Sequence, residues 1–217
     1  IQRYGDRLLV IEPPPEPLES AELDRVHELP YARRPHPKYR GRIPAFETIK
    51  DSIQAVRGCP GGCAFCGLVA HQGRHVMSRS EDSIWREADA ISRMPFFKGT
   101  ISDVGGAAGN IYGSRYNLEK CARCKRSSCL FPSPCPTYEC DGRAVVRMLR
   151  RLRSHPKIKH LYINSGIRLD LALRQPELLR ELVQFHVSGH LKVAPEHLNP
   201  VVLKLMRKSP AEEFYRF

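Results

Sequence analysis

The chain has 217 residues, of which 41% are hydrophobic and 27% are charged. This composition suits one sizeable folded domain and excludes a wholly disordered protein. No run of about 18 apolar residues occurs, so the sequence predicts no membrane span. The first residue is Ile1 and no charged-then-apolar leader follows it, so we expect a segment of a longer protein.

The net charge of +12 is concentrated in one part of the chain. Residues 121–160 carry ten Lys or Arg residues against two Asp or Glu residues, and they hold five of the eight cysteines. Such a stretch fits a solvated face, a nucleic-acid-binding surface, or cations that offset the charge of metal-bound thiolates. The charge alone leaves these three interpretations open.

Residues 1–50 are predicted to form an irregular arm or linker that follows a preceding domain. Pro13, Pro14, Pro15 and Pro17 favour an extended backbone that resists helix formation. A short helix is predicted over residues 21–29, and coil rich in Pro and Arg over residues 30–44.

Residues 51–217 alternate predicted strands with predicted helices. The helices show apolar side chains at a spacing of three and four residues, as at Ile84, Ala88 and Ile91. Alternation of this kind predicts an α/β fold with a parallel sheet built from right-handed crossovers. Strands are expected at 53–57, 99–104, 160–164 and 190–194, and helices at 80–94, 141–154, 176–185 and 201–207. Residues 107–140 form a cysteine-rich insertion after the second strand.

The cysteines are grouped like metal ligands rather than like disulfide partners. Cys59, Cys63 and Cys66 have the spacing C-x3-C-x2-C in a glycine-rich loop after the first strand. Three thiolates fall one short of the usual four of an iron–sulfur cluster, which leaves one metal position open for chemistry. The alternative is a zinc site completed by His71 or His75. Clustered reduced thiols also favour a cytoplasmic location.

The second group has the pattern C-x2-C-x4-C-x5-C-x4-C and spans residues 121–140. Four thiolates suffice for one zinc ion or one closed [4Fe–4S] cluster, so one of the five cysteines is spare. Because a catalytic cluster in the same chain would already require the assembly machinery, we favour a second cluster over zinc.

The first motif resembles the signature of radical S-adenosylmethionine (SAM) enzymes. The resemblance implies an incomplete partial TIM barrel and an enzyme in which Cys59, Cys63 and Cys66 hold a [4Fe–4S] cluster. It also implies that SAM occupies the open iron and is cleaved reductively to a 5′-deoxyadenosyl radical, and that Phe65 packs near the adenine. An electron donor such as flavodoxin or ferredoxin is implied as a partner.

The wider sequence resembles the YgiQ family of radical SAM proteins over nearly all of its length. The matching stretches are Pro30-Tyr31-Ala32-Arg33, His36-Pro37, Met77-Ser78-Arg79-Ser80-Glu81, Ile101-Ser102-Asp103-Val104-Gly105-Gly106 and Leu191-Lys192-Val193-Ala194-Pro195-Glu196-His197. The family is uncharacterised, so it names no substrate, and the segment is expected to end about two strands short of a complete core. For the second centre the resemblance favours Cys121, Cys124, Cys129 and Cys135 as ligands and Cys140 as the spare.

Further cofactor-binding residues are expected where the predicted strands end. Gly105 and Gly106 align with the glycine pair whose backbone contacts the SAM amino group, although Ala107 stands where many relatives have Glu. The alternative for this pair is a tight turn with positive φ. Ser165, Arg168 and Glu196 follow the third and fourth strands on the same rim, where Arg168 could pair with the SAM carboxylate. A structural cap or ion pair is the alternative for each.

The sequence therefore leaves two hypotheses for the function, from different classes of protein. The first is a radical SAM enzyme that acts on an unknown substrate, for which RNA is one candidate. The second is a metal-stabilised RNA-binding module without catalysis, whose affinity would fall steeply with salt.

Overall fold

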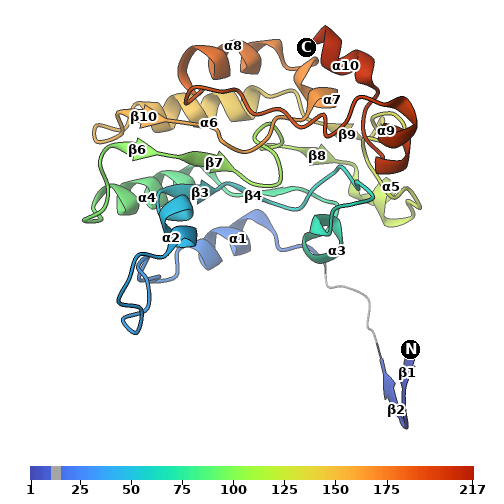
Figure 1. Cartoon of the computed structure of the whole chain (residues 1–217), viewed down its shortest axis with the longest axis horizontal. Helices are drawn as coiled ribbons and strands as arrows, with labels where there is room; N and C mark the ends of the chain where they lie inside the picture. The colour runs from blue at the N-terminus through green and yellow to red at the C-terminus, as the bar shows by residue number, and fades with distance from the viewer. Residues whose placement is uncertain (11–15) are drawn as a thin grey trace.

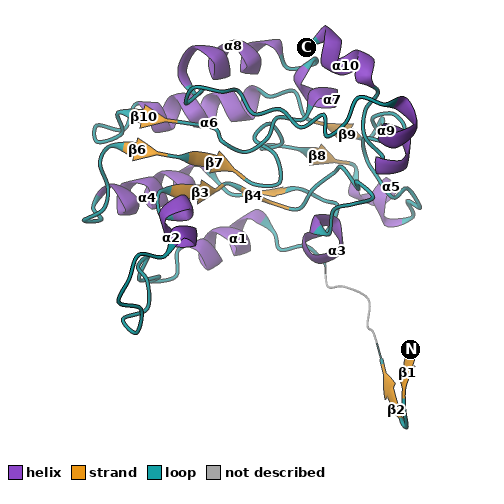
Figure 2. Ribbon diagram, viewed as in Figure 1, coloured by secondary structure: helices purple, strands orange, loops and turns teal. Residues whose placement is uncertain are grey.

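The computed structural model describes residues 1–10 and 16–217 and arranges them in layers (Figures 1 and 2). Short strands and their connecting loops form one layer, and the longer helices pack along it. Helix α6 (Arg143–Arg153) contacts both α8 (Pro176–Phe185) and α4 (Glu81–Ser92), and α4 in turn contacts α1 (Ser20–His27). The predicted α/β class is confirmed at this level. Closure into a partial barrel stays a prediction.

Parallel strand pairs define the sheet. Strand β3 (Ser52–Gln54) pairs with β7 (Asp103–Gly105), and β6 (Thr100–Ile101) pairs with β10 (His160–Leu161), both in parallel. The second predicted strand thus lies between the first and the third. The predicted strand 190–194 is reduced to one parallel bridge between Ile167 and Val193, which corrects the sequence-based expectation.

The other strands form antiparallel pairs of two or three residues. These are β1 (Gln2–Tyr4) with β2 (Arg7–Leu9), β4 (Val56–Arg57) with β5 (Met77–Ser78), and β8 (Arg115–Tyr116) with β9 (Tyr138–Glu139). The β8–β9 pair closes the cysteine-rich insertion. The first predicted strand is therefore divided at Ala55 into β3 and β4, which have different partners.

The predicted helices form close to their expected positions because their ends carry capping signals. The Ser80 side chain accepts a hydrogen bond from the Ser83 N–H at the start of α4, and α8 begins at Pro176. The remaining helices are α2 (Pro44–Ile49), α3 (Leu68–Gln72), α5 (Leu118–Ala122), α7 (Leu169–Ala172), α9 (Pro200–Met206) and α10 (Ala211–Arg216). No helix in residues 1–10 or 16–217 is long and apolar enough to cross a membrane.

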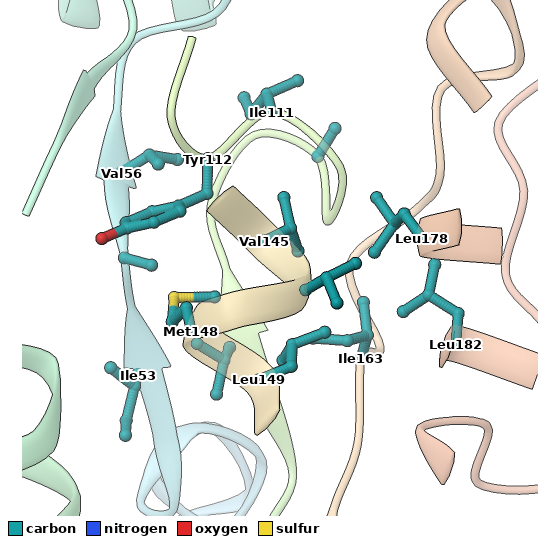
Figure 3. Close-up of a cluster of buried hydrophobic side chains, with 14 of the residues drawn as sticks. Ile53, Val56, Ile111, Tyr112, Val145, Met148, Leu149, Ile163, Leu178 and Leu182 are labelled. Atoms are coloured by element: carbon teal, nitrogen blue, oxygen red, sulfur yellow. The ribbon is translucent and has the colours of Figure 1, made fainter. Parts of the chain in front are cut away.

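The core lies between helix α6 and the parallel strands (Figure 3). Met148 and Leu149 of α6 are fully buried in the same cluster as Ile53 and Val56 of the first strand region. Leu178 and Leu182 extend the cluster to α8. This packing fixes the strand ends, from which the loops with the candidate site residues emerge.

The arm predicted over residues 1–50 is anchored to the core by its helix. In α1, Ser20 donates to the Ser78 carbonyl at 2.8 Å and Asp24 accepts from the Ser80 N–H at 3.0 Å. Arg33 reaches Glu87 of α4 at 2.7 Å. Pro13, Pro14 and Pro15 lie outside the described residues, and the β1–β2 hairpin stands apart from the layers (Figure 1).

Candidate metal centre

The first cysteine group occupies a loop between strand β4 and helix α3. Gly58 begins this loop with φ +96°, and a Cβ there would collide with the His75 carbonyl, so only glycine fits. Cys59 is buried, whereas Cys63 and Cys66 are partly exposed, and all three are free thiols. The loop is held by hydrogen bonds from the Cys59 N–H to the Gly73 carbonyl and from the Cys66 N–H to the Cys63 carbonyl, both at 3.1 Å.

The three thiols share one electrostatic environment. Burial raises the pKa of the Cys59 thiol, the Arg168 cation opposes that rise, and negative charge on Cys63 and Cys66 adds to it. The deprotonated set therefore needs positive charge nearby, and a metal centre supplies it. Three thiolates are the donor set of an iron–sulfur cluster with one open iron, and a nearby cation such as Arg168 would offset part of their charge.

A site for a single metal ion needs its ligands closer together than a cluster site does. In the described part of the chain, no group of three or more His, Cys, Asp or Glu side chains is arranged to hold one metal ion, so the zinc alternative with His71 or His75 gains no support. One zinc ion would draw its sulfur ligands to about 2.3 Å from a single point. A four-iron cluster instead binds its thiolates on separate irons, so its ligands stand farther apart.

Three cysteines of the second group affect the pKa of a fourth, Cys129. Burial raises the pKa of the Cys129 thiol to about 11; the Arg74 cation opposes this, and Cys135, Cys121 and Cys124 add to it. Hydrogen bonds to Thr137 lower the pKa of Cys135, and Arg126 acts in the same direction. Arg74 and Arg126 are thus the cations that lower the pKa values of these two thiols.

Cys140 has other partners. Its Sγ lies 3.4 Å from the Asn110 carbonyl oxygen and 3.5 Å from Nε2 of Gln175, which also donates to the Cys140 carbonyl at 2.8 Å. Burial raises the pKa of its thiol. These contacts place Cys140 in a buried polar cluster of its own, which supports its interpretation as the spare cysteine.

The two cysteine groups are joined by their backbones. The Cys129 N–H donates to the Pro60 carbonyl at 2.9 Å, and the Ser128 hydroxyl donates to the Gly61 carbonyl. Arg74, which follows the first group, donates to the carbonyl oxygens of Cys124 and Arg126 in the second. Sequence reasoning missed both residues: Ser128 is one of the intervening residues of the second motif, and Arg74 lies outside both motifs.

A cavity of about 350 Å³ opens beside the first loop. Helix α3, which directly follows Cys66, provides one wall, and strands β3 and β7 provide another. Its lining consists of Ser52, Ile53, Gln54, Leu68, Gln72, Asp103, Gly105, Gly106 and Ala107. The predicted glycine pair therefore faces a space that can hold a ligand.

The structure corrects the alternative reading of that glycine pair. Neither Gly105 nor Gly106 has a positive φ, so no tight turn demands glycine there. The reason is space: a Cβ on Gly105 would lie 2.9 Å from the Ser165 hydroxyl, and one on Gly106 would lie 2.5 Å from Cγ2 of Val56.

The other predicted cofactor contacts are placed as follows. Ser165 donates its hydroxyl to Asp103, a cavity residue that sequence reasoning missed. Arg168 binds Asp170 and points Nη1 at the sulfur of Cys63, at 3.7 Å. Glu196 has φ +68° and lies 3.6 Å from Nζ of Lys208. Phe65 is 55% exposed.

Of this predicted set, the described contacts therefore join Ser165 to the cavity and Arg168 to the cysteine loop. Glu196 and Phe65 are not joined to either by those contacts. Arg168 forms the ion pair with Asp170 that was the structural alternative for this residue, and its expected pairing with a SAM carboxylate stays a prediction. Burial lowers the pKa of Arg168, but Asp170 and Cys63 outweigh this and raise it overall, so the guanidinium stays charged.

Comparison with known proteins agrees with this site. Residues 53–217 match the family described as Radical SAM superfamily, and residues 1–52 match the one described as Radical SAM N-terminal. The chain belongs to the radical SAM superfamily, a class of enzymes that use an iron–sulfur cluster and SAM.

Its relatives narrow the resemblance to the YgiQ-like proteins. The chain is 46% identical over 229 residues to a UPF0313 protein of Porphyromonas gingivalis and 47% over 218 residues to one of Geobacter sulfurreducens. It is 44% identical over 220 residues to the UPF0313 protein YgiQ of Salmonella typhimurium. Each alignment covers 100% of this chain but 36%, 36% and 30% of the relative, so the chain spans about a third of their length. The predicted resemblance is confirmed.

Proposed function

We propose that the protein cleaves SAM reductively and uses the resulting radical on a substrate that the sequence does not identify. The observation that carries the proposal is the cavity of about 350 Å³, because α3 joins it directly to the loop of Cys59, Cys63 and Cys66. A [4Fe–4S] cluster bound by these three cysteines would supply the electron that splits SAM into methionine and a 5′-deoxyadenosyl radical.

The residues of this chain have separable roles in the proposal. Cys59, Cys63 and Cys66 hold the cluster, and the glycine pair Gly105 and Gly106 lets SAM approach the backbone along one cavity wall. Asp103 accepts hydrogen bonds from the Ser165 hydroxyl and from the Ser165 N–H, the latter at 3.0 Å. Ser165 is thereby fixed beside Asp103, which lines the cavity, and we expect its hydroxyl to contact the ribose or carboxylate of SAM.

The test compares two cysteine variants of the anaerobically reconstituted protein. Cys66→Ala should retain too few thiolates to hold the cluster and should form no 5′-deoxyadenosine with SAM and dithionite. Cys140→Ala is the matched control, since its sulfur is bound to Asn110 and Gln175 instead, and it should keep both iron and SAM cleavage. SAM cleavage by Cys66→Ala at the wild-type rate would refute the assignment.

We also propose a second centre on Cys121, Cys124, Cys129 and Cys135, and a [4Fe–4S] cluster rather than zinc. The other three thiols raise the pKa of Cys129 through their negative charge, while Arg74 lowers the pKa of Cys129 and Arg126 lowers that of Cys135. These charge interactions support the proposal. The variant with Cys59, Cys63 and Cys66 all replaced by Ala isolates this centre. About four irons with equal sulfide per chain would support a cluster, and one zinc without sulfide would establish the alternative.

The RNA-binding alternative gains no support from the comparisons. The basic helix α6 is also largely paired with acids: Arg147 with Glu81 at 3.3 Å, and Arg150 with Glu181 at 2.8 Å. These pairs favour the interpretation of the basic stretch as a solvated, ion-paired face.

The proposal keeps two features of the domain organisation: a boundary near residue 51 and a cysteine-rich insertion over residues 107–140.

The eight free thiols are suited to a reducing, cytoplasmic compartment. The reductive cleavage of SAM calls for a low-potential electron donor such as flavodoxin or ferredoxin.

A further inference from the structure

The positive charge of Arg168 is buried next to the sulfur of Cys63, one of the three proposed cluster ligands. The residue is 7% exposed, and its Nη1 lies 3.7 Å from Sγ of Cys63. Its Nε and Nη2 bind the two carboxylate oxygens of Asp170, Nε at 3.1 Å. One guanidinium therefore bridges a fixed carboxylate and a thiolate ligand.

The backbone of Arg168 is fixed as well. Asn110, which is fully buried, accepts the Arg168 N–H and donates to the Arg168 carbonyl, both at 3.0 Å. Its amide also donates to Oε1 of Gln175 at 3.0 Å. A side chain held at both its backbone and its head group keeps its direction toward Cys63 without a further loss of rotamer freedom.

The cluster loop is shaped to receive this guanidinium. A Cβ on Gly61 would collide with Nη1 of Arg168 and would lie 3.4 Å from Sγ of Cys63. Gly61 has no positive φ, so its backbone would accept alanine. Its lack of a side chain is needed for the approach of Arg168 to the sulfur.

We propose that Arg168 is a positioning residue for the Cys63 thiolate and that its charge raises the reduction potential of the cluster that Cys63 holds. The inference rests on the proposed function, since it requires the cluster on Cys59, Cys63 and Cys66. Reduction adds negative charge to the cluster, and a hydrogen-bond donor with positive charge at a ligand sulfur stabilises the reduced state more than the oxidised one. Asp170 moderates the effect, because its carboxylate offsets part of the charge.

The experiment is a redox titration of the first cluster, followed by electron paramagnetic resonance, in the Cys124→Ala, Cys135→Ala background that removes the second centre. Arg168→Gln should make reduction harder, by about tenfold in the reduction equilibrium, which is about 59 mV for one electron. Gly61→Ala should shift the potential in the same direction, because its methyl group displaces the guanidinium. Asp170→Asn should shift it the opposite way. Arg180→Met, which removes an exposed charge on α8, is the control and should leave it unchanged.

A double variant separates this role from general damage to the loop. If Gly61→Ala acts through Arg168, it should shift the potential no further when Arg168→Gln is already present. Iron content near four per chain with an unchanged potential in both single variants would overturn the inference and leave the proposed function intact. A wild-type protein that holds no iron at Cys59, Cys63 and Cys66 would overturn both.

Discussion

The backbone N–H of Cys129 donates to the carbonyl oxygen of Pro60 at 2.9 Å, so the two cysteine groups share a hydrogen bond although they lie far apart in the sequence. Pro60 stands between the first two cysteines of one group, and Cys129 is the buried member of the other. The insertion is therefore part of the wall of the first site. A change that separates the two loops should affect both centres.

Gly62 provides a direct test of that coupling. It has φ +58°, and a Cβ there would collide with the Ser127 carbonyl. Gly62→Ala should cost about 1–3 kcal/mol of unfolding free energy and lower the iron retained by Cys59, Cys63 and Cys66. Gly67→Ala is the control in the same loop, because a Cβ there meets nothing within 4 Å. Thermal unfolding and iron analysis measure both, and equal behaviour of the two variants would contradict the coupling.

The thiols of the second group should differ in reactivity in metal-free protein. Burial raises the pKa of Cys129 to about 11, whereas hydrogen bonds to Thr137 lower the pKa of Cys135. At pH 8 only about 0.1% of Cys129 is then thiolate, and its alkylation should speed up about tenfold per pH unit until the pH nears 11. Cys135 should react first and level off at lower pH.

The measurement is iodoacetamide labelling followed by mass spectrometry of the peptides. Thr137→Val removes the hydroxyl that bonds to Cys135, so it should slow the labelling of Cys135 and leave Cys129 unaffected. Faster labelling of Cys129 than of Cys135 at pH 8 would contradict the assignment.

The structure also assigns a stabilising role to a buried acid between the arm and the core. Glu87 of α4 receives Arg79, which is 1% exposed, and Arg33 of the arm. Glu87→Ala leaves the Arg79 charge buried without its partner, so it should cost about 3–5 kcal/mol of unfolding free energy. Urea denaturation measures this. Glu28→Ala breaks the exposed pair with Arg86 and should change stability little, so a comparable loss there would argue against the burial effect.

The sequence predicted the parts of this molecule that local patterns determine. Helix α8 begins at Pro176 and ends at Phe185, as expected, because its first-turn proline and its apolar spacing lie within the helix itself. The lengths of the strands were harder to predict, because they depend on pairing partners elsewhere in the chain. The strand expected at 190–194 forms only a single bridge, at Val193. The cysteine motif predicted the family, which the match to the radical SAM superfamily confirms.

The environment of the cysteines could not be predicted in the same way. Arg168 lies against Cys63, a contact between residues far apart in the sequence that only the folded chain brings together. Asp103 lies within a predicted strand, where its sequence context gives no sign that it faces a cavity. Spacing predicts which residues are candidate ligands, but the residues that surround them depend on tertiary packing.

Gly106 illustrates that dependence and leads to a last prediction. A Cβ on residue 106 would lie 2.5 Å from Cγ2 of Val56 and 3.0 Å from its carbonyl oxygen. Gly106→Ala should therefore cost about 1–3 kcal/mol of unfolding free energy through overpacking, without any strain from φ. Val56→Ala removes Cγ2, so the double variant should be more stable than the sum of the two single losses predicts, by about 0.5–3 kcal/mol.

Urea denaturation of the four proteins in this cycle gives the coupling energy, and strictly additive losses would show that Gly106 does not pack on Val56. SAM binding by equilibrium dialysis then separates packing from ligand contact. Because the double variant relieves the crowding but keeps a methyl group on the cavity wall, it should fold and still bind SAM more weakly than Val56→Ala alone. Equal SAM affinity in those two variants would mean that Gly106 serves only the packing of the strand, and that SAM does not approach the backbone there.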